Sequence, residues 1–347
     1  MQKPAKFWEK SSGEDVKCVL CPRECNISPE NVGYCRARKN IEGELYTLVY
    51  GESTSANPDP IEKKPLYHFY PGSRVFSMST AGCNFECKHC QNWNLSQASV
   101  EEIDTEFIEP EEAIERTKKT NCQGIAYTYG EPVIWFEYAL DVAKLASEEG
   151  LYNVFVTNGY MNLDGWKELK PYLDAMNVDV KAFSDKFYKT ICGGASVKPV
   201  LETCEWAVDN GIHLEITNLI IPEENDSPEE IRKLCQWIAQ DLHPRVPIHF
   251  SRFRPMYKMV DKSSTPVSAL ERALEIAKDE GLEHIYVGNV PGHEADNTYC
   301  PECGELLITR HGFSVAKYNL KDHQCPSCGA EINVIGEYKP SSSRFPF

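Results

Sequence analysis

Short runs of β-branched or aromatic residues alternate with longer amphipathic segments from about residue 74 onward. Runs of the first kind are typical of buried strands, and segments of the second kind are typical of helices that cover a sheet. Repeated strand–helix units build parallel sheets, so the pattern predicts an α/β fold, a partial to near-complete (β/α) barrel. We expect strands near 74–80, 124–129, 152–157, 175–182, 212–221 and 247–253, with a closing strand near 284–290. We expect helices near 110–119, 133–149, 163–173, 197–210, 227–240 and 266–280.

Cysteine-rich segments flank this repeat on both sides. A chain of 347 residues is long enough for one barrel with small appendages. We therefore expect a cysteine-bearing N-terminal segment over residues 1–46, the barrel over 47–295 and a zinc-ribbon-like C-terminal segment over 296–347.

Composition limits the location and the partners that we expect for the chain. It has no apolar run of about 18 residues that would span a bilayer, and its first ten residues lack the apolar stretch of a signal peptide. We therefore expect a cytoplasmic protein with no membrane partner. The net charge, 36 minus 52 or −16, disfavours nonspecific attraction to nucleic acid. An RNA substrate at a specific site stays open, without support from composition.

Fifteen cysteines in a chain without a secretion signal indicate metal ligands rather than disulfides, because the cytosol keeps thiols reduced. Eleven of them fall into three groups. The other four are isolated in the sequence, and we expect them to act as small buried hydrophobes. These four are Cys122, Cys192, Cys204 and Cys235.

The central group is Cys83, Cys87 and Cys90, spaced C-x3-C-x2-C without a fourth cysteine nearby in the sequence. Three thiolates hold three irons of a [4Fe–4S] cluster and leave the fourth iron open. S-adenosylmethionine (SAM) can chelate that iron, and the reduced cluster then cleaves SAM to a 5′-deoxyadenosyl radical. The alternative is a zinc site that borrows a distant histidine. It is weaker, because the loop directly follows the strand that begins the βα series.

With His89 beside its last cysteine, this loop resembles that of the radical SAM superfamily. Four further segments resemble the radical enzyme of the AmmeMemoRadiSam system, a relative of the pyruvate formate-lyase activating enzymes. The resemblance implies an iron–sulfur enzyme whose partners include Memo-like and AMMECR-like proteins. We also expect an external electron donor of the flavodoxin or ferredoxin type. The four segments span residues 59–66, 68–73, 82–85 and 90–93.

The resemblance also implies a set of SAM contacts. His89 corresponds to a ring that packs near the adenine, and the motif with Gly130 and Glu131 to the one that receives the amino group of SAM. Activating enzymes carry an aspartate where this chain has Val156, which puts the cation site that uses this aspartate in doubt. The full set implied is His89, Gly130, Glu131, Asn158, Asp179, Lys181 and His249.

The two outer cysteine groups indicate further metals. Cys300, Cys303, Cys325 and Cys328 form two C-x2-C pairs, the spacing of a structural zinc site. Cys18, Cys21, Cys25 and Cys35 suit either zinc or an auxiliary iron–sulfur cluster, since four thiolates bind both. For this second group we favour zinc or another structural metal.

Three hypotheses for the function follow. The first is a radical SAM enzyme that takes hydrogen from a protein, as activating enzymes do. The second is radical modification of RNA or a small metabolite. The third, of another class, is a noncatalytic iron–sulfur or zinc protein that carries electrons or acts as a scaffold. The third predicts a fully ligated central cluster, whereas three cysteines leave one iron open.

Overall fold

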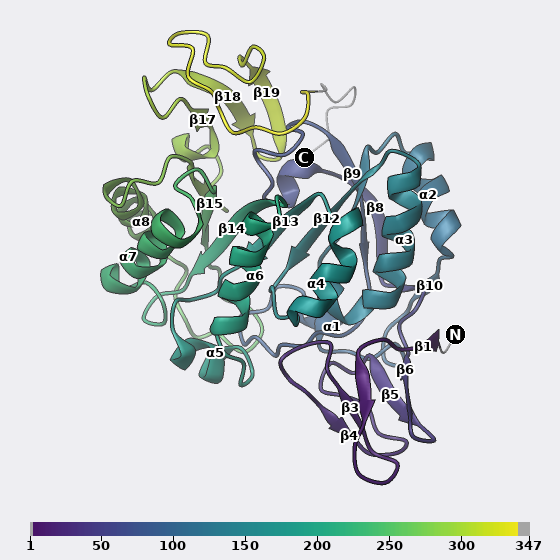
Figure 1. Cartoon of the computed structure of the whole chain (residues 1–347). Coiled ribbons are helices and arrows are strands. Elements are labelled where there is room, and N and C mark those ends of the chain that lie inside the picture. Colours follow the sequence, from purple (N-terminus) through teal and green to yellow (C-terminus); the bar gives the residue numbers. More distant parts are fainter. Residues whose placement is uncertain (1–2, 339–347) are drawn as a thin grey trace.

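The computed structural model describes residues 3–338 and has an eight-stranded sheet at its centre (Figure 1). The strand order is β16-β15-β14-β13-β12-β11-β9-β8, and all neighbours are parallel except β8, which runs antiparallel to β9 at one edge. The strands are β8 (Ser55–Pro60), β9 (Arg74–Ser79), β11 (Gly124–Tyr127), β12 (Tyr152–Thr157), β13 (Ala175–Asp179), β14 (His213–Ile220), β15 (Ile248–Arg252) and β16 (Ile285–Gly288).

The sheet is an open, partial barrel. Its two edge strands, β8 and β16, do not pair with each other in the described part of the chain. The expected closing strand near 284–290 is present as β16, but it extends the sheet beside β15 instead of closing it. The predicted α/β class with a parallel sheet is thus confirmed, and the sheet of the described residues stays open.

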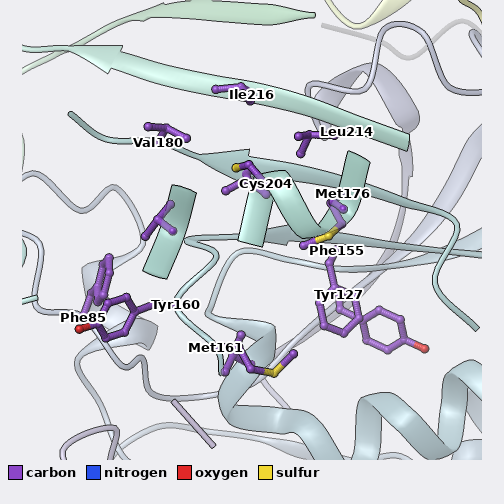
Figure 2. Close-up of a cluster of buried hydrophobic side chains, with 14 of the residues drawn as sticks. Phe85, Tyr127, Phe155, Tyr160, Met161, Met176, Val180, Cys204, Leu214 and Ile216 are labelled. Carbon is purple, nitrogen blue, oxygen red and sulfur yellow. The ribbon is translucent and has the colours of Figure 1, made fainter. Parts of the chain in front are cut away.

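Helices cover the outer face of the sheet, with α3, α4 and α6 lying across the side seen in Figure 1. Each has an apolar stripe that packs on the sheet, as the amphipathic pattern predicts. Figure 2 shows that this layer also takes up Cys204 of α6, which lies among apolar side chains that include Leu214 and Ile216 of β14. The expected helices are α2 (Pro110–Lys119), α3 (Phe136–Glu148), α4 (Leu163–Leu169), α6 (Lys198–Asp209), α7 (Pro228–Trp237) and α8 (Val267–Asp279).

The N-terminal segment forms small antiparallel sheets at the end of the barrel where β9 leads into the central cysteine loop (Figure 1). A buried ion pair attaches it to the barrel, with Arg38 Nη2 2.5 Å from Glu137 Oε1. Its strands are β1 (Lys3–Pro4), β2 (Trp8–Lys10), β3 (Val16–Cys18), β4 (Asn26–Ile27), β5 (Arg38–Ile41) and β6 (Glu44–Thr47), and next to them β7 (Glu52–Ser53) pairs with β10 (Glu106–Phe107).

Residues 61–73, which we call the plug segment, fill the inside of the open barrel. Ile61, Leu66 and Phe69 pack there against small and β-branched residues of the strands. The C-terminal segment contacts the plug segment from the end of the barrel opposite the N-terminal segment (Figure 1). The Tyr70 amide donates to the Ile335 carbonyl at 2.7 Å. The strands of the C-terminal segment are β17 (Thr298–Tyr299), β18 (Leu306–His311) and β19 (Ser314–Tyr318), and its residues 339–347 lie outside the described part.

None of the helices in residues 3–338 has the length and apolar character needed to cross a bilayer.

Candidate cluster and cofactor site

The central cysteine loop connects β9 to the single-turn helix α1 (Trp93–Ser96). Cys83 Sγ accepts a hydrogen bond from the Phe85 amide at 3.3 Å, and Cys90 Sγ lies 3.3 Å from Ser96 Oγ. Hydrogen bonds to sulfur stabilise thiolates, the form that binds metal. Cys87 is buried and the other two are half-buried.

Thiol spacing separates this loop from a zinc site. In residues 3–338, the four C-terminal cysteines have all their sulfur atoms within 4.8 Å of one another. The three central cysteines do not form such a close group. Ligands around one zinc ion lie about 3.8 Å apart, as Zn–S bonds of about 2.3 Å in a tetrahedron require. A [4Fe–4S] cluster holds its thiolates farther apart, because four irons and four sulfides lie between them. The donor set therefore fits the cluster better than a single ion.

Glu131 organises the ends of the two strands next to the loop. Its carboxylate accepts hydrogen bonds from the Thr157 hydroxyl at 2.5 Å, the Asn158 amide at 2.8 Å and the Val133 amide at 3.1 Å. Burial raises the pKa of Glu131 to about 7, against these hydrogen bonds. The Glu131 carboxylate also raises the pKa of the Cys83 thiol, after burial, so the two groups are neighbours.

Asn158 links this carboxylate to the cysteine loop. Its side-chain amide donates to Asn84 Oδ1 at 2.8 Å and points to Cys83 Sγ at 3.8 Å. Gly130 lies beside the same loop, where a Cβ atom would come within 2.7 Å of the Thr80 carbonyl oxygen. Only glycine allows this approach of β11 to β9. Glu131, Asn158 and Gly130, all predicted from the sequence, therefore meet at Cys83.

A second group lies around Cys87. Lys181 Nζ is 2.9 Å from Asp179 Oδ2, and its charge acts on both Cys87 and His89. Burial, and to a smaller extent Lys181, lowers the pKa of His89 to about 3, so its ring is neutral. His89 Nδ1 has no hydrogen-bond partner in the described part of the chain. A neutral, buried ring with a free nitrogen fits packing against a cofactor.

His249 lies in a different cluster from the other six predicted residues. Its Nε2 is 2.7 Å from Glu215 Oε2, and its ring packs between Tyr67 and Tyr286, with centroids 4.7 and 5.0 Å away. The Glu215 carboxylate also accepts from His213 and from the His68 amide of the plug segment. These hydrogen-bonded contacts place His249 inside the barrel against the plug segment, and the structure does not bring it to the cysteine loop.

Cys192 is a residue that sequence reading missed. It follows α5 (Asp185–Ile191), and the Lys88 amide donates to the Ile191 carbonyl at 3.0 Å. This pairing brings the Cys192 thiol to Cys87, where its hydrogen bond lowers the pKa of Cys87. Cys192 is therefore a neighbour of the cluster loop and not the isolated hydrophobe that we expected. The contact joins residues far apart in the sequence, so no local spacing signals it.

The plug segment contacts the site through the buried side chain of Lys64. Lys64 Nζ lies 2.8 Å from Asp59 Oδ2 and donates to the Tyr129 hydroxyl at 3.2 Å. Burial lowers the pKa of Lys64 to about 8, against the attraction of Asp59. Because Tyr129 immediately precedes Gly130, this contact holds the strand end that carries the Gly130–Glu131 motif.

The outer cysteine groups differ in geometry. In the C-terminal set, Cys300 Sγ is 3.6 Å from Cys328 Sγ, and Cys303 Sγ is 3.6 Å from Cys325 Sγ. This spacing fits a single tetrahedral ion such as zinc. The N-terminal set, Cys18, Cys21, Cys25 and Cys35, lines a cavity instead.

Comparisons with known proteins agree with this geometry. Residues 77–237 match the family model of the Radical SAM superfamily. The chain is 45% identical over 333 residues to an uncharacterized protein of Methanocaldococcus jannaschii, which covers 95% of this chain and 99% of that protein. It is 29% identical over 164 residues to the pyruvate formate-lyase-activating enzyme of Clostridium pasteurianum, covering 45% of this chain and 66% of that enzyme.

Among solved structures, a radical SAM methyltransferase from Sphaerobacter thermophilus aligns with a TM-score of 0.50 at 16% identity. The alignment covers 68% of this chain and 72% of that one. At this identity the likeness concerns the fold alone.

Proposed function

Because residues 77–237 match the model of the Radical SAM superfamily, we propose that the chain is an activating-enzyme-like radical SAM enzyme that takes hydrogen from a protein substrate. The superfamily implies a [4Fe–4S] cluster and SAM. When bound, the cluster supplies the electron that breaks the sulfur–C5′ bond of SAM, and the resulting 5′-deoxyadenosyl radical abstracts the hydrogen. Homology to an activating enzyme supports this choice within the superfamily.

The observation that carries the proposal is the convergence of strand-end residues on a loop with three thiols. Cys83, Cys87 and Cys90 would hold the cluster. The Glu131 carboxylate, oriented by Thr157 and Asn158, would receive the ammonium group of SAM. The neutral ring of His89 would pack on the adenine.

Further roles follow from position. Asp179 keeps 40% of its side chain exposed although Oδ2 pairs with Lys181, so its carboxylate can still meet the polar part of SAM. Gly130 would let the backbone approach the cofactor. His249 is left out of the proposed SAM site, because its ring nitrogen is engaged by Glu215.

An aromatic pair beside the loop, the exposed Trp93 and the half-buried Tyr257, supports a macromolecular substrate. Trp93, which begins α1, is 44% exposed, and its ring stacks on that of Tyr257 with centroids 5.1 Å apart and planes within 7°. The next residue, Lys258, donates its backbone amide to the Lys88 carbonyl at 3.0 Å, which ties this surface to the cluster loop. Exposed Trp and Tyr side chains are typical of the residues that dominate protein interfaces.

Charge and architecture favour protein over RNA. The net charge of −16 opposes binding to phosphates. The C-terminal segment, which as a zinc ribbon would be the natural RNA-docking element, lies at the end of the barrel away from the cysteine loop (Figure 1).

The first test is anaerobic SAM cleavage. The protein is reconstituted with iron and sulfide and reduced, SAM is added, and 5′-deoxyadenosine is quantified beside a variant with Cys83, Cys87 and Cys90 changed to Ala. We expect product from the wild type alone. A reducible cluster that yields no product would contradict the proposal and favour the noncatalytic alternative.

The second test addresses the substrate. Memo-like and AMMECR-like proteins are added one at a time, and we expect one of them to increase 5′-deoxyadenosine formation and to gain a radical EPR signal or a mass change. Trp93→Ala should abolish the increase while leaving SAM cleavage without partner intact. Phe313→Ala is the matched control, because Phe313 is also an exposed aromatic, 50% exposed, but lies on the C-terminal segment. Stimulation by RNA and not by protein would overturn the substrate assignment.

A further inference from the structure

The four N-terminal cysteines line one cavity. The barrel contributes Asn84, Val133 and Ile134 to its lining. The apolar lining residues are Leu20, Ile27, Val133 and Ile134.

The two outer cysteine groups offer an internal comparison. Both have four cysteines, but the C-terminal thiols lie within 4.8 Å of one another and the N-terminal ones do not meet this limit, not even as a group of three. Thiols around one zinc ion would lie about 3.8 Å apart. The N-terminal thiols are therefore arranged around something larger than a single ion.

Two arginines, the buried Arg38 and the half-buried Arg23, give an independent indication of what the cavity holds. Arg38 is 1% exposed, lines the cavity and places Nη1 3.8 Å from Cys18 Sγ, yet its Nε has no hydrogen-bond partner in the described residues. Arg23 also lines the cavity, and its Nη2 is buried without a partner there. Buried N–H donors without acceptors cost free energy. The bridging sulfides of an iron–sulfur cluster would accept them, whereas a zinc ion brings no such acceptor.

We propose that Cys18, Cys21, Cys25 and Cys35 hold a second [4Fe–4S] cluster, in place of the structural metal that the spacing alone favoured. Four protein thiolates leave no open iron, so this cluster does not bind SAM or substrate. The guanidinium groups of Arg38 and Arg23 balance part of the negative charge that the ligated cluster carries.

The position of the cavity indicates the role of the second cluster. Asn84, the residue after Cys83, forms part of its wall, and its carbonyl accepts from Arg23 Nε at 2.9 Å. The carbonyl oxygen of Cys35 lies where a Cβ of Gly82 would come within 2.5 Å of it. The two cysteine loops are therefore in direct contact. A second cluster here is placed to pass electrons to the first.

The electron-transfer role rests on the proposed function, and it requires the transfer of one electron at a time. One electron from an external low-potential donor of the flavodoxin or ferredoxin type reduces the N-terminal cluster from its 2+ to its 1+ state. The same electron then passes to the catalytic cluster, and the N-terminal cluster returns to 2+. No bond forms or breaks in the relay, and no proton moves.

The decisive experiment keeps the N-terminal set and removes the catalytic one. The variant with Cys83, Cys87 and Cys90 changed to Ala is reconstituted anaerobically, and its iron, sulfide and zinc are measured. We expect about four irons and four sulfides per chain, with about one zinc from the C-terminal set, and a cluster EPR signal that SAM does not change. About two zinc ions and no iron would overturn the proposal. The result does not depend on SAM cleavage, so failure here is distinguishable from failure of the proposed function.

A second measurement tests the relay. In the chain with all other cysteines intact, Cys25→Ala should lower 5′-deoxyadenosine formation driven by a flavodoxin, while dithionite, which reaches the catalytic cluster directly, should still support it. Cys235→Ala is the control, since Cys235 is buried in α7 away from both loops. Equal loss with both reductants, or no loss with either, would overturn the relay.

Discussion

The pKa of the Glu131 carboxyl group is determined by the surroundings of the side chain. It is 3% exposed and accepts three hydrogen bonds, and burial still prevails to raise its pKa to about 7. Its carboxyl group therefore changes charge near neutral pH. A general consequence is that binding of a cation at this position is coupled to pH.

We expect Glu131→Gln to weaken SAM binding by about 10- to 100-fold, because one charge-assisted hydrogen bond contributes about 1.5–3 kcal/mol. In the wild type, SAM affinity should rise as pH increases through about 7, since only the ionised carboxylate attracts the ammonium group. The variant should lack this rise. Isothermal titration between pH 6 and 8, as a rough window around that pKa, measures both effects. A parallel pH profile in wild type and variant would contradict the role given to Glu131.

Cys192 raises a different question, since it brings a fourth thiol to the catalytic loop. If it only donates a hydrogen bond to Cys87, Cys192→Ala should keep the cluster and shift its reduction potential to more negative values. A shift of some tens of millivolts is expected, because about 59 mV corresponds to a tenfold change for one electron. Hydrogen bonds to cluster sulfurs favour the reduced, more negative state.

A redox titration followed by the EPR signal that responds to SAM measures this shift, with Cys204→Ala as control. Loss of that iron centre in Cys192→Ala would identify Cys192 as a fourth ligand. The central cluster would then have no open iron, and the proposed function would be wrong.

Among the elements, the plug segment carries an unusual pair of lysines. Asp59 binds both Lys63 and Lys64 at 2.8 Å, but Lys63 is 38% exposed and Lys64 only 1%. Two salt bridges of equal length to one carboxylate thus differ strongly in burial. Their contributions to stability should differ accordingly.

We expect Lys64→Met to lower the free energy of unfolding by about 3–5 kcal/mol, because it leaves a largely buried carboxylate with one partner fewer. Lys63→Met should cost at most about 1 kcal/mol, as exposed pairs do. Urea unfolding of the two variants provides the comparison, and equal costs would contradict the buried-pair interpretation.

The contribution of Lys64 to folding stability changes with pH in the opposite direction to that of a lysine whose pKa is raised by an ion pair. Its folded pKa of about 8 lies below the ordinary value of 10.5, so between these values the unfolded chain holds a proton that the folded chain has released. The contribution of Lys64 to stability should therefore increase as pH rises from about 8 to 10.5. Unfolding curves of the wild type should show this increase, and those of Lys64→Met should lack it.

The main elements were predictable because long strands and helices repeat a clear period. The strand predicted near 152–157 and the helix near 110–119 end where β12 and α2 do. The elements that were missed are short or break local rules. Helix α5 has seven residues, and β8 contains Pro58 and Pro60, which are tolerated because β8 is an edge strand.

The candidate site was predictable where residues follow strand ends. Glu131 lies in the turn that follows β11, Asn158 comes directly after β12 and Asp179 ends β13, and parallel strands end at the same edge of the sheet. His249, by contrast, is the second residue of β15, and it pairs with Glu215 inside the barrel. Cys192 depends on a helix that the pattern did not reveal. Long-range contacts of this kind have no signature in local spacing.

At the scale of the whole molecule, the two cysteine-bearing segments lie at opposite ends of the barrel (Figure 1). The N-terminal segment contacts the catalytic loop, and the C-terminal segment contacts the plug segment. Metal at the two ends should therefore affect different properties of the protein.

We expect Cys303→Ser to release zinc from the C-terminal set and to destabilise that segment, since structural zinc contributes directly to folding. SAM affinity should change by no more than about twofold, because distant sites act independently. Zinc content, protease sensitivity of the C-terminal segment and a SAM titration test this. A large loss of SAM binding would show that the two ends communicate.

The contact between Gly82 and the Cys35 carbonyl also bears on how the protein matures in the cell. The N-terminal segment leaves the ribosome first, but the wall of its cavity is completed by Asn84, Val133 and Ile134, which are made later. Cofactor insertion at the N-terminal cysteines therefore has to wait for the first half of the barrel.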